Sequence, residues 1–94
     1  RKKWNRPDLP VVVGELGNGG EKAGAHMQAI RQAQAAACNR EELGGKTLFV
    51  KTTQFHRPKE ESPNVGHGHH WFGNAESYFL IGDALGKAMV DLAR

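Results

Sequence analysis

Apolar residues gather in four segments of the chain, and their spacing predicts what each segment forms. The segment 9–13 contains three consecutive valines, which Pro10 precedes and a glycine-rich stretch follows. A second run of β-branched and aromatic residues covers 47–52. Short runs of this kind, bounded by turn residues, predict strands. Because the first run has no polar alternation, it predicts a strand that is buried on both faces.

The segment 25–38 is rich in helix formers and carries one narrow apolar stripe. The stripe consists of Met27, Ile30, Ala33 and Ala37. Strand, helix and strand in this order predict a βαβ unit with parallel strands.

A longer helix is predicted from about Asn74 to Arg94. Gly82 and Gly86 share one strip of this helix, which predicts that a neighbouring backbone packs closely there. Its apolar face comprises Tyr78, Ile81, Leu85, Ala88, Met89 and Leu92.

Two parallel strands do not form a stable sheet alone, and parallel strands need both faces covered. The chain has 94 residues and begins at Arg1, with no initiator Met and no signal-peptide pattern. We therefore expect residues 1–94 to be a partial domain, the end of a larger doubly wound α/β domain. A self-contained enzyme with a deep cleft is not expected at this length.

Charge, cysteine content and apolar run length argue against a nucleic-acid-binding protein, a disulfide-stabilised domain and a membrane-spanning segment. The net charge is +3, and Arg1, Lys2, Lys3 and Arg6 supply four positive charges within six residues. Because later basic residues are scattered among carboxylates, a solvated chain end is favoured and a nucleic-acid partner is not predicted. The single Cys38 excludes an internal disulfide. No apolar run reaches the roughly 20 residues of a membrane span.

The segment 56–70 combines prolines, glycines, charges and four of the five histidines, which predicts an exposed loop. It follows the second predicted strand, at the sheet edge where α/β domains bind ligands. The cluster at 66–71, Gly-His-Gly-His-His-Trp, is open to three interpretations. It can be a solvated loop, a metal site without a clear fourth ligand, or the source of a catalytic base just before the last helix.

No complete catalytic triad is present. Ser62 and Ser77 are the only serines and neither lies in a G-x-S-x-G elbow, so a capping or surface role is expected for Ser77. The glycines at 14–24 match neither phosphate-binding fingerprint and predict a surface turn. Arg31 and Gln34 lie beside the apolar stripe of the first helix, as a surface pair or as an internal polar link.

Several short motifs together resemble the C-terminal part of the sialate O-acetylesterase and acetylxylan esterase-like group of SGNH hydrolases. They occur in the family's order over nearly the whole chain: Leu-Pro-Val-Val-Val-Gly-Glu-Leu-Gly at 9–17, Ile-Arg-x-x-Gln at 30–34 and Phe-Val-Lys-Thr at 49–52. The most specific is His-His-Trp-Phe-Gly-Asn-Ala-Glu-Ser-Tyr-Phe-Leu-Ile-Gly at 69–82, which continues into 84–89.

This resemblance implies an α/β fold, with the chain as the C-terminal βαβα portion of a three-layer α/β/α domain, flavodoxin-like as in SGNH hydrolases. It implies hydrolysis of O-acetyl esters on carbohydrates by a serine nucleophile and a histidine base, without metal or organic cofactor. The serine and the oxyanion-hole residues would lie upstream of Arg1. His70 matches the family histidine best because Trp71 follows it, and His69 is the second choice.

The resemblance further implies a structural role for Arg31 and Gln34 and favours an exported, extracytoplasmic protein. In one respect the chain departs from the family: an Asp commonly precedes the histidine and orients it, but residues 65–69 are Val-Gly-His-Gly-His. Either a backbone carbonyl or His67 orients the ring, giving a Ser–His dyad, or the protein is a weak or inactive member. The alternative function is a noncatalytic carbohydrate-binding or interaction module.

Overall fold

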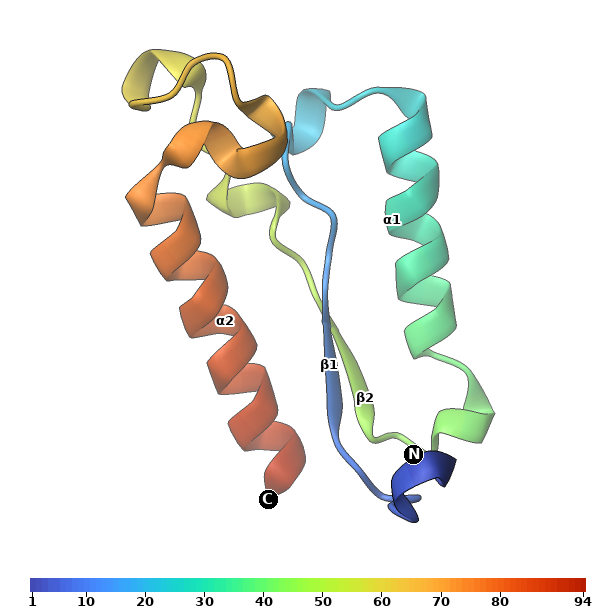
Figure 1. The fold of residues 1–94 in the computed structure, drawn as a ribbon. Coiled ribbons are helices and arrows are strands. Elements are labelled where there is room, and N and C mark those ends of the chain that lie inside the picture. Colours follow the sequence, from blue (N-terminus) through green and yellow to red (C-terminus); the bar gives the residue numbers. More distant parts are fainter.

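The computed structural model describes all residues 1–94 and places a two-stranded sheet between two long helices (Figure 1). The order is β1 (Val11–Gly14), α1 (Ala25–Cys38), β2 (Thr47–Val50) and α2 (Ala75–Ala93). These bounds agree with the predicted elements to within a few residues. Short 3-10 segments fill the connections: η1 (Lys2–Trp4), η2 (Gly20–Lys22), η3 (Glu41–Leu43), η4 (Thr53–Phe55), η5 (Lys59–Glu61) and η6 (Gly68–Gly73). The backbone of η6 is kinked, with non-helical dihedral angles at 70–72.

The two strands are parallel, with Val11 opposite Thr47 and Gly14 opposite Val50. Alternate side chains of a strand point to opposite faces of the sheet. Val11, Val13 and Thr47 line a cavity together with residues of α1, whereas a Cβ on Gly14 would meet Leu85 of α2 at 3.4 Å. The helices therefore cover opposite faces, and the mixed α/β fold with a parallel sheet is confirmed.

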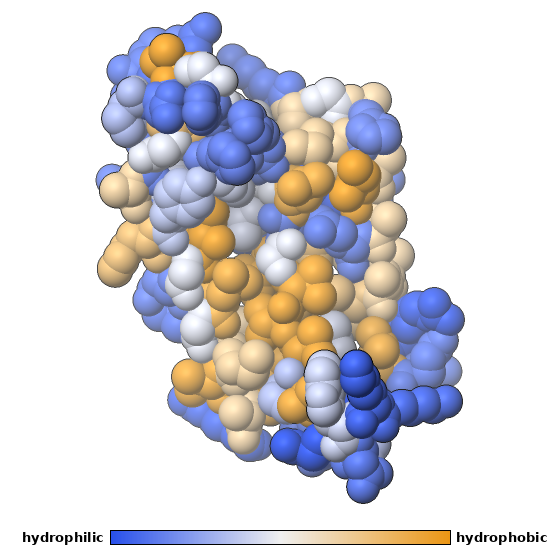
Figure 2. All heavy atoms as spheres, viewed as in Figure 1, coloured by the Kyte–Doolittle hydropathy of each residue, from blue (hydrophilic) through white to orange (hydrophobic).

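The expectation that the first strand is buried on both faces is wrong for this chain. All four residues of β1 are only half-buried, because the sheet has no third strand and each face has one helix. Buried apolar residues are few, namely Cys38 and Leu92. Apolar atoms nevertheless gather over the middle of the molecule, while hydrophilic atoms dominate both ends (Figure 2).

Helix α1 turns only part of the predicted stripe inward, because Met27 and Ile30 are half-buried and Ala37 lines the cavity beside β1. Ala33 and Ala37 are exposed, and the buried positions are Arg31 and Cys38. Arg31 turns inward because its guanidinium binds backbone carbonyls of the loop after β1. Apolar spacing alone did not identify Arg31 as a buried position.

Helix α2 begins where predicted, and its N-terminus is capped by Asn74, whose side chain accepts a hydrogen bond from Ser77 N–H at 3.0 Å. The expected capping or surface role of Ser77 is wrong. Ser77 is fully buried, and its hydroxyl donates to the carbonyl of Phe55 at 2.7 Å. Nothing lies within 4 Å of a Cβ built on Gly82 or Gly86, so the predicted close neighbour is not part of this chain.

The basic residues at the start of the chain are not all solvated. The Arg1 guanidinium donates to the carbonyls of Leu9, Leu43 and Lys46 and to the hydroxyl of Thr47, each at 2.9 Å. Arg1 thereby ties the amino ends of the two strands together. A membrane-spanning helix is not found, since neither long helix combines the required length and apolarity.

Candidate functional site

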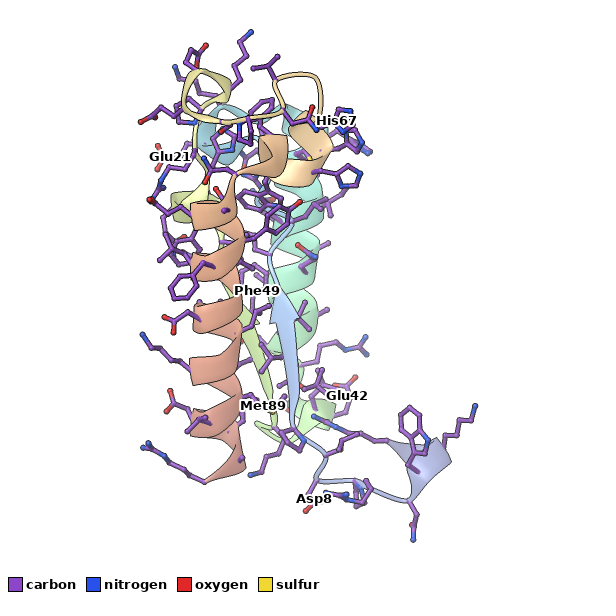
Figure 3. The ribbon with its side chains drawn as sticks, turned by 60° about the vertical axis from the view of Figure 1, so that its left-hand side comes forward. Asp8, Glu21, Glu42, Phe49, His67 and Met89 are labelled. Atoms are coloured by element: carbon purple, nitrogen blue, oxygen red, sulfur yellow. The ribbon has the colours of Figure 1, made fainter.

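Two loops meet beyond the carboxyl ends of the parallel strands. The loop at 15–24 leads from β1 to α1, and the loop at 51–74 leads from β2 to α2. His67 and Glu21 lie at this end of the molecule, whereas Asp8 and Glu42 lie at the opposite end (Figure 3). The histidine cluster is therefore at the edge where α/β domains bind ligands, as the sequence predicted.

The structure brings His67, His69 and His70 together as three exposed rings. The ring centroids of His69 and His70 are 4.1 Å apart, and His67 lies 5.8 Å from His69 and 6.2 Å from His70. No hydrogen bond or ion pair joins these imidazoles to a carboxylate. The nearest ring to His70 is thus His69, rather than the His67 that the sequence suggested as an orienting partner.

The backbone around His70 is held in place from both sides. Its N–H donates to the carbonyl of His67 at 3.0 Å, and its own carbonyl accepts from the Tyr78 hydroxyl at 2.7 Å. Trp71 and Phe72 follow with φ of 55° and 53°. Left-handed backbone is unfavourable for such bulky residues and is typical of functional sites, where the surroundings enforce it.

Arg31 and Gln34 fix the loop that follows β1. The Arg31 side chain, 5% exposed, donates to the carbonyls of Leu16 at 2.5 Å, Gly20 at 2.9 Å and Asn18 at 3.1 Å. The Gln34 amide accepts from Leu16 N–H at 2.9 Å and donates to the carbonyl of Gly14 at 3.5 Å. Both residues make internal polar links, and neither reaches the histidine cluster through a hydrogen bond.

Glu15 is a site residue that sequence reasoning missed. Its Oε1 accepts from the N–H of Thr52 at 2.9 Å, the N–H of Thr53 at 3.0 Å and the Thr53 hydroxyl at 2.6 Å. Burial acts to raise the pKa of Glu15, but these hydrogen bonds and the Arg31 charge outweigh it and hold the pKa below its ordinary value. The Glu15 carboxylate therefore joins the two loops at their base.

His56 is the second residue that sequence reasoning did not single out. Its ring lies 6.2 Å from the Trp71 ring and 5.9 Å from the Phe72 ring, between centroids. A Cβ on Gly20 would come within 2.9 Å of His56 Cδ2, so only glycine allows this approach. The buried Nδ1 of His56 has no hydrogen-bond partner. His56 thus stands between the loop after β1 and the aromatic residues that follow His70.

Neither serine of the chain faces an imidazole. The Ser62 hydroxyl donates to the carbonyl of Pro58 at 2.8 Å, and Ser77 is buried against η4. No group of three His, Cys, Asp or Glu side chains is arranged to hold a metal ion.

The chemistry that this arrangement offers is proton transfer by an exposed imidazole on a fixed backbone at the ligand-binding edge of the sheet. Comparisons with protein-family models, curated proteins and solved structures found no match to the chain. Its function is therefore inferred from the residues and geometry of this edge.

Proposed function

We propose that this chain supplies the histidine-bearing part of a serine esterase that removes O-acetyl groups from carbohydrates. His70 is the general base, and the serine and oxyanion-hole donors belong to residues that precede Arg1 in a longer protein. The observation that carries the proposal is the position of His70, exposed in the loop between β2 and α2 at the carboxyl edge of the parallel sheet.

Three features of the chain support this proposal. The motif from His69 to Gly82 resembles the corresponding segment of SGNH carbohydrate esterases. The backbone of His70 is held by hydrogen bonds to His67 and Tyr78, so the main-chain atoms that carry the imidazole have a fixed position. Finally, β1 and β2 each have one edge without a hydrogen-bonded neighbour in this chain. Further strands of a larger parallel sheet could pair with these edges.

The proposed reaction follows the logic of serine hydrolases. His70 removes the proton from the serine hydroxyl as the serine oxygen bonds to the acetyl carbonyl carbon, and backbone or amide donors stabilise the oxyanion. The C–O bond to the sugar then breaks, and the sugar oxygen takes the proton from His70. Water, deprotonated by the same imidazole, releases acetate and restores the serine.

The orientation of His70 differs from that in a complete triad. In this chain no carboxylate makes a hydrogen bond or ion pair with the ring, and the nearest aromatic ring is that of His69, 4.1 Å away between centroids. We propose a Ser–His dyad in which the fixed backbone and the adjacent His69 ring restrict the His70 imidazole.

The test is acetate release by the longer protein with an acetylated sugar substrate. His70→Ala should lower kcat/KM by about 10²–10⁴-fold, the usual contribution of a general base. His26→Ala is the matched control, because His26 is exposed at the start of α1; it should leave kcat/KM unchanged. Near-normal turnover of His70→Ala would refute the assignment, and a loss confined to His69→Ala would transfer it to His69.

A noncatalytic carbohydrate-binding or interaction module is the second candidate, and the observation that favours it is the lack of a carboxylate beside His70. The sequence that precedes Arg1 discriminates between the two functions. A Gly-x-Ser block and Gly and Asn oxyanion donors there favour the esterase, whereas their absence favours the module.

A further inference from the structure

A concave surface lies between the two loops at the carboxyl edge of the sheet, and no role has been assigned to it so far. It is a cavity of about 420 Å³ between the loop after β1 and the loop after β2. Its lining residues are Gly19, Gly20, Glu21, Lys22, Thr53, Gln54, His56 and Pro58. We name it the interloop pocket, and its volume falls within the range of about 300–1,000 Å³ that is typical of small-molecule sites.

The topology of the chain explains why a pocket forms at this point. The loop after β1 leads to α1 on one face of the sheet, and the loop after β2 leads to α2 on the other face (Figure 1). When the loops after two adjacent parallel strands diverge in this way, they leave a crevice at the carboxyl edge, and α/β domains bind ligands in such crevices.

Both walls of the interloop pocket are held by charged side chains. Arg31, through its hydrogen bonds to the carbonyls of Leu16, Asn18 and Gly20, fixes the first wall. The Glu15 carboxylate fixes the start of the second wall through the N–H groups of Thr52 and Thr53 and the Thr53 hydroxyl. Since the walls are ordered before a ligand arrives, binding costs less conformational entropy.

The lining is chemically suited to a ligand with many hydroxyl groups. It contains no hydrophobic residue. Lys22 offers donors, Glu21 offers acceptors, and the Gln54 amide offers both. Because a sugar hydroxyl both donates and accepts hydrogen bonds, this mixture can pair with several hydroxyls at once. The Lys22 and Glu21 charges cancel, so the pocket has no net preference for an anionic sugar.

His56 links the interloop pocket to the segment that carries the proposed catalytic histidine. It lines the pocket, and its ring also packs near Trp71, the residue that follows His70. From these observations we infer that the interloop pocket is a subsite for a neutral sugar ring of the acetylated carbohydrate, an inference that rests on the proposed function and specifies its substrate class.

The experiment is a titration of the ¹⁵N-labelled longer protein with xylobiose, a neutral disaccharide, and separately with N-acetylneuraminic acid, an anionic sugar. Xylobiose should cause saturable shifts in the amide resonances of Gly20, Thr53 and Gln54. Gln54→Ala should weaken this binding about fivefold, as expected for one lost hydrogen bond. Gln32→Ala is the matched control on the exposed face of α1 and should bind xylobiose normally.

A second readout is kinetic: in the longer protein, Gln54→Ala should raise KM for an acetylated xylose substrate while kcat keeps its wild-type value. The absence of xylobiose binding, shifts that map outside the pocket, equal weakening by Gln32→Ala, or tighter binding of N-acetylneuraminic acid would each overturn the inference. Because the titration requires no hydrolysis, its result is independent of the test of His70.

Discussion

The Glu15 carboxylate provides the sharpest test of how the two site loops are joined. It accepts three hydrogen bonds from Thr52 and Thr53, at 2.6–3.0 Å, and in Glu15→Gln these would come to a neutral amide oxygen. Hydrogen bonds to a charged group contribute about 1.5–3 kcal/mol and neutral ones about 0.5–1.5 kcal/mol. Because the three bonds share one acceptor and are not additive, we expect Glu15→Gln to cost about 2 kcal/mol of unfolding free energy at pH 7.

The sign of the pH dependence follows from the lowered pKa of Glu15. A carboxyl with a lower pKa in the folded state stabilises the fold at pH values above its unfolded pKa of about 4.3, and this stabilisation is lost as the pH falls through the folded pKa. The difference in stability between the wild-type chain and Glu15→Gln should therefore be full at pH 7 and shrink in acid.

Urea unfolding of the longer protein, followed by circular dichroism at a series of pH values from neutral to acid, measures this difference. Glu60→Gln is the matched control, since Glu60 is exposed and makes no side-chain hydrogen bond or ion pair; it should change stability by less than about 0.5 kcal/mol. A Glu15→Gln chain as stable as wild type at pH 7, or a deficit that persists undiminished in acid, would refute the reasoning.

Three further substitutions test the loops by the same unfolding assay. Arg31→Ala leaves the buried carbonyl of Gly20 and the part-buried carbonyls of Leu16 and Asn18 without this donor, and should cost about 3 kcal/mol. Exposed Arg40→Ala should cost less than about 0.5 kcal/mol, and equal losses would contradict the role of Arg31 in holding the loop. Gly20→Ala combines a φ of 63° with a clash against His56 and should cost at least about 1 kcal/mol, so an unchanged midpoint would be inconsistent with the packing. Ser77→Ala should cost about 1–3 kcal/mol by leaving a carbonyl unpaired, and no loss would rule out that contact.

The strands and helices could be predicted from the sequence because each coincides with a run of one hydrophobic pattern. The β-branched runs became β1 and β2, and the helix-forming segments became α1 and α2. The buried face of α1 could be read only in part. Apolar spacing identified Met27 and Ile30, which are half-buried, but not Arg31, which is buried because its guanidinium binds carbonyls in the loop after β1.

The candidate site was likewise only partly predictable. The position of His70 at the carboxyl edge follows from the order of elements, but its surroundings depend on contacts between distant segments. The roles of Glu15 and His56 could not be read from the sequence, because each acts through a partner in another loop, Thr53 for one and Gly20 for the other. The left-handed Trp71 could not be foreseen either, since bulky residues rarely adopt that conformation.

The central claim, that His70 activates a serine outside this chain, is tested most directly by the rate at which a fluorophosphonate labels the longer protein. The account predicts labelling of one serine that precedes Arg1, at a rate at least about 100-fold lower in His70→Ala and unchanged in His26→Ala. Equal labelling rates in wild type and His70→Ala, or labelling only at Ser62 or Ser77, would contradict it.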